Sequence, residues 1–168
     1  DLLERTELDT PDNPAATADK NAFVALIADT YFRVLTEAIR KFDPNHMILG
    51  CRFAGGRAED SVWAACGRYC DIGTFNFYGT VDLDRRIALG GHNLSAPPLA
   101  EAFAAFHEKC GKPLMITEWS FPALDAGLPS TKGAGQRFRT QAERAEASGI
   151  YLRAILRLPF MVGSDYFM

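Results

Sequence analysis

Residues 112–121 read KPLMITEWSF, and residues 71–78 read DIGTFNFY. Both stretches are short apolar runs rich in β-branched and aromatic residues, which is typical of buried β-strands. HMILGCRF (46–53) and FMVGSDYFM (160–168) have the same character. The sequence therefore predicts four strands, and polar or aromatic side chains stand near the carboxyl end of each.

Four helices are predicted around these strands. The first carries an apolar stripe at helical spacing and ends at Asp43–Pro44, because the residue before a proline avoids the helical region; the stripe is Phe23, Ile27, Tyr31, Val34, Ala38 and Phe42. Residues 58–69 and 97–110 predict two more helices. The fourth has the stripe Phe138, Ala142, Ala145, Gly149, Leu152 and Leu156. Gly149 lies on that stripe, which indicates a close backbone approach there.

Alternation of strands and helices predicts an α/β fold with a parallel sheet. Two architectures fit: an open flavodoxin-like sheet, or a partial (β/α)8 TIM barrel. The 168 residues fall well short of the ~250 of a complete barrel. We divide the chain into an acidic lead segment, expected to be a loop (1–22), and a βα region (23–168). The chain begins without Met, so we expect a processed or truncated start.

Composition excludes several partner classes. The net charge is -3, and Lys and Arg are dispersed, so no nucleic-acid footprint is present. No apolar run has the length of a membrane span, which predicts a soluble chain. Cys51, Cys66, Cys70 and Cys110 lack the spacing of a zinc site, and no nucleotide-binding motif occurs. We therefore predict no metal and no cofactor. The compartment cannot be read from these residues.

Glu118 is the strongest candidate for chemistry. A carboxylate at the end of a buried strand is costly unless it is paired or faces a cleft. Strict alternation places Leu114, Ile116 and Glu118 on one face of their strand, with Asn76 and Tyr78 on the equivalent face of the preceding strand. A carboxylate, an amide and a phenol would then converge. The alternative is a structural ion pair of Glu118 with Arg52.

The segments DPNHMILGCRF (43–53), DIGTFNFY, KPLMITEWSF and LPFMVGSDYFM (158–168) together resemble the second half of a retaining (β/α)8 glycoside hydrolase of the agarase and β-galactosidase type, covering strands five to eight. This resemblance implies that Glu118 is the nucleophile and that Tyr78, with Asn76, orients it. It also implies sugar-binding roles for Trp119, Asp165, Tyr166, Arg52 and Phe53. The implied substrate is a β-linked galactose-type polysaccharide or oligosaccharide, and the parent enzyme would be secreted or periplasmic.

One part of the family pattern is missing. The general acid/base is the glutamate of an Asn-Glu pair that ends strand four, and this chain contains no Asn-Glu dipeptide. The chain would then be a fragment, inactive alone, that associates as a homodimer or with a missing amino-terminal barrel half. A non-catalytic carbohydrate-binding or scaffold half barrel is the alternative. A third reading is an open sheet that binds a phosphorylated ligand at KGAGQR (132–137).

Overall fold

The computed structural model describes residues 13–129 and 134–167. It contains a parallel sheet in the order β1-β2-β5-β6 and a separate antiparallel hairpin, β3-β4. The elements are α2 (Pro14–Arg40), β1 (Phe53–Ala54), a 3-10 turn η1 (Gly55–Arg57), α3 (Asp60–Tyr69), β2 (Gly73–Asn76), β3 (Thr80–Asp82), β4 (Ile87–Leu89), α4 (Leu99–Cys110), β5 (Leu114–Trp119), α5 (Gln141–Leu156) and β6 (Met161–Tyr166).

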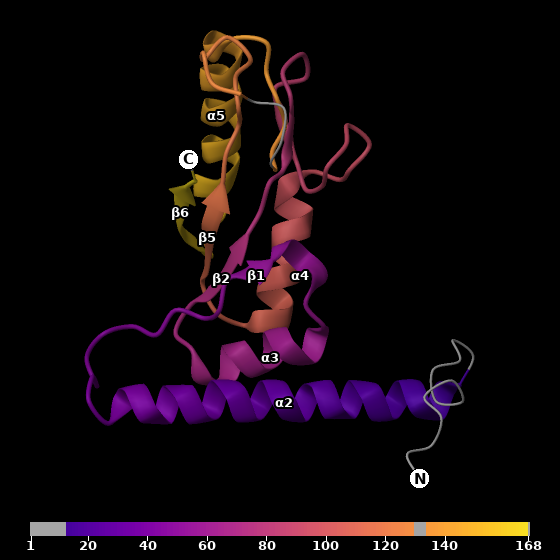
Figure 1. Ribbon diagram of the computed structural model, residues 1–168, viewed down its shortest axis with the longest axis vertical. Helices are drawn as coiled ribbons and strands as arrows, with labels where there is room; N and C mark the ends of the chain where they lie inside the picture. The colour runs from indigo at the N-terminus through magenta and orange to yellow at the C-terminus, as the bar shows by residue number, and fades with distance from the viewer. Residues whose placement is uncertain (1–12, 130–133, 168) are drawn as a thin grey trace.

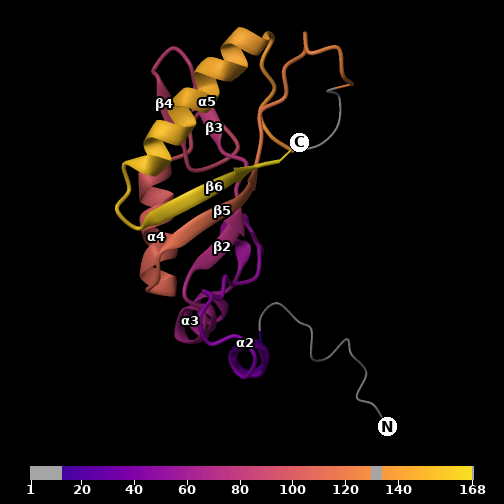
Figure 2. The same cartoon turned by 90° about the vertical axis from the view of Figure 1, so that its left-hand side faces the viewer.

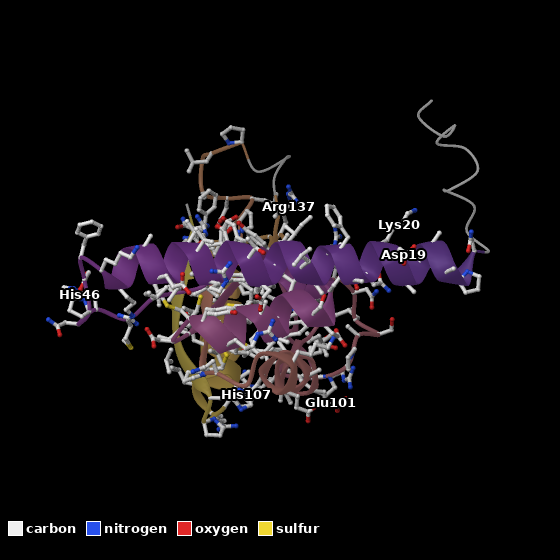
Figure 3. All side chains as sticks on the ribbon, turned by 90° about the horizontal axis from the view of Figure 1, so that it is seen from below. Asp19, Lys20, His46, Glu101, His107 and Arg137 are labelled. Carbon is white, nitrogen blue, oxygen red and sulfur yellow. The ribbon has the colours of Figure 1, made fainter. Side chains whose placement is uncertain are left out.

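The predicted α/β class with a parallel sheet is confirmed. The strands follow each other across the sheet in chain order, with no reversal within these four strands. Strands β2 and β5 point away from α2, so their carboxyl ends lie on the side of the sheet that is turned away from that helix (Figure 1). Figure 2 shows β5 and β6 side by side along the sheet. Seen from below, α3 lies between α2 and α4. The labelled side chains Glu101 and His107 belong to α4, on the side of α3 that is turned away from α2 (Figure 3).

The core lies between the sheet and helices α3, α4 and α5, and it is unusually aromatic. Phe75 of β2 packs edge-on against Phe103 of α4 with ring centroids 5.1 Å apart. Trp63 of α3 stacks on Phe106 at 5.5 Å. Tyr151 of α5 is fully buried, and its hydroxyl donates to the Phe77 carbonyl at 2.7 Å. These contacts hold β2 in place from the helix side.

Helix α2 begins earlier than the sequence predicts. It starts at Pro14, whereas a loop was expected as far as residue 22; residues 1–12 lie outside the described residues. The side chain of Asn13 accepts a hydrogen bond from Ala16 N at 3.2 Å, and proline is well suited to the first helical position. An N-cap followed by proline thus starts a helix in a segment whose charge and prolines favoured a loop.

The apolar stripe of α2 does not face the core of this chain. Phe23, Ile27, Tyr31 and Val34 are 47–62% exposed, and Phe42, just beyond the helix, is 90% exposed. Ala28 and Phe32, which were not on the predicted stripe, are the buried residues of α2. The helix prediction is confirmed. However, α2 packs against the rest of the described chain through Ala28 and Phe32 and not through the predicted apolar stripe.

Three other expectations need correction. Of the strand predicted at 46–53, only Phe53 pairs within a strand, although Leu49 forms an isolated bridge with Ile72. The region 79–96, expected to be a long loop, contains the β3-β4 hairpin, whose strands are too short for an alternation pattern. Helix α5 buries Ala147, Ile150, Tyr151 and Ile155 rather than the predicted stripe. Phe138 is buried, but it lies before the first residue of α5. The predicted stripe took Phe138 as its first helical position, and it therefore selected the wrong face of the helix.

Among the residues that the structure describes, no helix is long and apolar enough to cross a membrane. The four cysteines are free thiols. No group of three or more His, Cys, Asp or Glu side chains within residues 13–129 and 134–167 has a geometry that could hold a metal ion.

Candidate active site

A β-bulge in β5 sets the direction of Glu118. Phe75 pairs with Ile116 and the next residue, Asn76, pairs with Glu118, so β5 carries one extra residue, Thr117. The pairing of β5 with β6 slips over the same interval. A bulge reverses the alternation of side chains beyond it. Ile116 is therefore fully buried in the core, whereas Glu118 points to the other side of the sheet.

Three side chains donate hydrogen bonds to the Glu118 carboxylate. The Tyr78 hydroxyl donates to Oε1, and the Asn76 amide donates to Oε2 at 2.9 Å. The Arg52 guanidinium forms an ion pair with Oε2. These residues come from the segment before β1, from β2 and from just beyond β2. The predicted convergence of carboxylate, amide and phenol is thus what the structure shows, and the ion pair with Arg52 accompanies it.

The amide of Asn76 is held in one orientation. Its Oδ1 accepts from the Thr117 hydroxyl at 3.0 Å and from Arg52 Nε at 3.3 Å. Oδ1 is an acceptor and Nδ2 a donor, so these two contacts turn the NH2 group toward Glu118. Thr117 therefore contributes twice, first as the bulge residue and then as a donor that fixes Asn76. The sequence reasoning did not select Thr117, because a bulge leaves no mark in the apolar pattern.

The donor set favours an ionised Glu118. A carboxylate offers only acceptors, and a guanidinium offers only donors, so the three contacts match the charged form. The Glu118 side chain is 19% exposed and Arg52 is 52% exposed, which leaves the carboxylate reachable from solvent. Burial, followed by the hydrogen bond to Glu118, raises the pKa of Tyr78 well above its usual range. Tyr78 consequently stays protonated and remains a donor.

The other predicted site residues lie elsewhere. Phe53 is buried, with its ring 4.4 Å from Trp63, and Trp119 is buried against Tyr151 at 4.8 Å. Both face the helices, so neither lines the surface that Glu118 reaches. The ring of Tyr166 on β6 is partly exposed and packs edge-on against Trp119 at 5.1 Å. Asp165 is exposed on the same strand.

Two hollows flank Tyr78, and apart from Tyr78 and Asn76 their lining residues were not among the predicted site residues. The larger, about 580 Å³, is lined by the β1-η1 turn, the end of β2, the loop after β4 and α4; it includes Arg57, Asn76, Tyr78, His92 and Phe106. The smaller, about 300 Å³, is lined by Tyr78, His92, Asn93 and Gln136 among others. His92 and Tyr78 border both hollows, so the two form one groove beside Glu118.

The phosphate-binding expectation for KGAGQR rested on those glycines opening a helix. The helix begins at Gln141, where the Thr140 side chain accepts from Glu143 N at 3.1 Å. The side-chain amide of Gln136 instead forms two hydrogen bonds with the backbone of Val81 in β3. Its Oε1 accepts from Val81 N at 2.7 Å and its Nε2 donates to Val81 O at 3.0 Å. Lys132 and Gly133 lie outside the described residues. Gly135 and Gln136 thus belong to a loop anchored beside Tyr78, away from any helix start.

Comparison with known proteins identifies related chains. No family model matches the sequence. Beta-agarase A and Beta-agarase B of Vibrio sp. (strain JT0107) are 28% identical over 151 residues and 26% identical over 149 residues. The crystal structure of an agarase superposes with a TM-score of 0.74 at 27% identity, covering 95% of this chain.

The chain is similar to one part of the β-agarases. It spans 14% of the length of the two curated β-agarases and 22% of the agarase of known structure. The expected resemblance to agarase-type glycoside hydrolases is thereby confirmed, over a short part of the length of those proteins. The similarity covers 89% of this chain for each of the two β-agarases and 95% for the agarase of known structure.

Proposed function

We propose that this chain is the carboxyl-terminal half of a retaining (β/α)8 glycoside hydrolase domain that acts on β-linked galactose-type polysaccharide. The observation that carries the proposal is the position of Glu118 at the carboxyl end of β5, held by Tyr78, Asn76 and Arg52. Functional residues of α/β barrels gather at this end of the strands. Similarity to the β-agarases supports a galactose polysaccharide as substrate.

The sheet supports the half-barrel reading. Parallel strands that neighbour each other in chain order are what four consecutive βα units of a barrel would give. β1 and β6 form the two edges of this sheet, and each would continue to another strand in a closed barrel. The proposed domain division, with the βα region at 23–168, follows from this reading, although α2 now extends it back to Pro14.

In the proposed mechanism Glu118 is the nucleophile of a two-step displacement. The ionised carboxylate attacks the anomeric carbon and forms a glycosyl-enzyme, while a second carboxyl group ~5 to 5.5 Å away protonates the leaving oxygen and later activates water. Tyr78 and Asn76 hold the attacking oxygens in place. The acid/base glutamate would come from strand four of the missing half, so this chain alone is expected to be inactive.

The exposed face of α2 fits an association with that half. Its large apolar side chains include Phe23, Leu26, Ile27, Val34 and Leu35, each 45–62% exposed. Fully burying one such side chain contributes about 1.5–3 kcal/mol. We propose that the amino-terminal half of the barrel, or in its absence a second copy of this chain, covers this face.

The Arg52 ion pair favours a second candidate, a non-catalytic carbohydrate-binding or scaffold module. The Arg52 guanidinium forms an ion pair with Oε2 of Glu118. A carboxylate whose role is to hold a cation in place requires no second, acid/base carboxyl group. In that case Glu118 would hydrogen-bond sugar hydroxyls without attacking carbon.

Complementation separates the two candidates. The purified chain, mixed with the separately expressed amino-terminal barrel half of a β-agarase, should release reducing ends from agarose, and the chain alone should not. Glu118→Gln should abolish the release. Glu101→Gln, an exposed carboxylate on α4, is the matched control and should leave it unchanged. Oligosaccharide binding without turnover in the complemented sample would favour the binding module, and equal activity of Glu118→Gln would overturn the nucleophile assignment.

A further inference from the structure

The groove beside Tyr78 has a charge pattern that Glu118 chemistry does not require. Its larger hollow, hereafter the Arg57 hollow, is lined by one arginine and one histidine, and no carboxylate belongs to its lining. Apolar and small residues make up most of the remaining wall. A cavity of about 580 Å³ with a few placed polar groups has the dimensions of a small-ligand or single-sugar site.

Arg57 differs from most other arginines of the chain. Many of them form ion pairs with a carboxylate, namely Arg33, Arg40, Arg52, Arg68, Arg85, Arg86 and Arg139. Arg57 makes no ion pair or hydrogen bond with the residues at 13–129 and 134–167. It is exposed at the end of η1, directly at the hollow. Its guanidinium therefore has its full set of donors available to a ligand.

The backbone around Arg57 is held by packing. Gly56 lies against the ring of Phe106, where an added Cβ would come within 2.3 Å of two ring atoms. Phe106 in turn stacks on Trp63 in the core. The turn that carries Arg57 is thus seated on the core rather than free, although the side chain itself is exposed.

The hollow is continuous with the proposed catalytic residues. Asn76 and Tyr78, which donate to Glu118, also line it. The hollow therefore begins at two of the side chains that hold the Glu118 carboxylate. Guanidinium groups bind carboxylates and sulfate-like oxyanions in a bidentate manner that a neutral hydroxyl cannot match.

We propose that the Arg57 hollow is a subsite for an anionic substituent, a sulfate ester or a carboxylate, on a galactose-type polysaccharide. This inference rests on the proposed function and narrows its substrate class. Arg57 supplies the charge, and the His92 ring and the phenol of Tyr78 form the walls beside it. Because the guanidinium is exposed, solvent screens the contact, and we expect an affinity advantage of about tenfold over a neutral chain.

Calorimetry with the purified chain tests the proposal. The probes are three galactan oligosaccharides of equal length: neutral, O-sulfated and carboxylated. The sulfated or the carboxylated probe should bind about tenfold more tightly than the neutral one at low salt, and the advantage should shrink at about 0.5 M salt. The probe that holds the advantage identifies the substituent.

Variants assign the advantage to one residue. Arg57→Gln should remove the affinity advantage of the anionic probe over the neutral probe, and Arg57→Lys should retain part of this advantage. Arg157→Gln, which alters an exposed arginine at the carboxyl end of α5, is the matched control and should keep the advantage.

Equal affinity for the three probes, an advantage that survives Arg57→Gln, or no binding of any probe would overturn the subsite. The proposed function is judged separately, by the effect of Glu118→Gln on neutral agarose. A missing anionic preference together with Glu118-dependent agarose hydrolysis would therefore reject the subsite and keep the hydrolase.

Discussion

Gly67 is predicted to be the least replaceable glycine of the helices. It lies inside α3, where alanine would on intrinsic propensity stabilise a helix by about 0.5–1 kcal/mol. A Cβ at this position would however lie 1.7 Å from the Cys110 carbonyl oxygen and 2.8 Å from its carbonyl carbon. These are backbone atoms at the end of α4, which cannot rotate away. Gly67→Ala therefore requires α3 and α4 to move apart.

The expected loss follows from these two opposing effects. Overpacking a core costs about 1–3 kcal/mol and at times more, and this contact is backbone against backbone. Taking the upper end of that range, about 3 kcal/mol, and subtracting the propensity gain of about 0.5–1 kcal/mol, we expect a net destabilisation of about 2–2.5 kcal/mol. For a domain of this size 1 kcal/mol corresponds to about 2–4 °C, so the melting temperature should fall by about 4–10 °C.

Gly149→Ala is the matched control. Gly149 also lies inside a helix, α5, but the nearest atom to its added Cβ is an Arg153 guanidinium nitrogen at 3.3 Å, the far end of a flexible side chain. The same substitution should here raise the melting temperature by a few degrees at most. Thermal unfolding followed by circular dichroism compares both variants with the parent. A Gly67→Ala melting temperature equal to or above that of the parent would refute the reasoning.

Three further outcomes are expected. Because burial and the bond to Glu118 raise the pKa of Tyr78, its phenolate should be missing near pH 10, so the absorbance titrations at 295 nm of the parent and of Tyr78→Phe should coincide there. Tyr151→Phe should lower the unfolding free energy by about 1–3 kcal/mol in urea titrations, because it leaves the buried Phe77 carbonyl without its donor, whereas Tyr31→Phe on the exposed side of α2 should change nothing. Ile27→Gln combined with Val34→Gln should leave the melting temperature of the chain nearly unchanged but weaken its association with itself or with an amino-terminal barrel half, as measured by light scattering; unchanged association would argue against α2 as the contact face.

The sequence predicted the convergence of Glu118, Asn76 and Tyr78 better than it predicted the faces of the helices. Glu118, Asn76 and Tyr78 were found because strand ends are easy to recognise when an apolar run stops at a polar residue. The reason given for their convergence was only half right, since strict alternation would have left Glu118 on the side of Ile116. A bulge depends on the pairing partners of a strand, which the local pattern does not contain.

For Phe53 and Trp119 the sequence predicted an exposed position beside the carboxylate, whereas the structure buries both side chains. Aromatic residues beside a carboxylate suggested a sugar-binding surface, yet both rings complete the core beneath the helices. Neighbours in sequence on a strand point to opposite sides, so adjacency to Arg52 or Glu118 in fact places them away from the site. The stripe of α2 was correctly identified as apolar, but a sequence cannot say whether the partner of an apolar face lies in the same chain.

The extra residue in β5 has a consequence for how this strand can change. Pairing slips on both of its sides over the same short interval, so the two neighbouring strands have adapted to one length of β5. If the bulge were lost at unchanged length, with Thr117 paired like its neighbours, Glu118 would return to the side of Ile116 and enter the aromatic layer around Trp63 and Phe75. An unpaired charge there would cost several kcal/mol. The bulge in this segment is therefore more tightly constrained than the identity of its apolar residues.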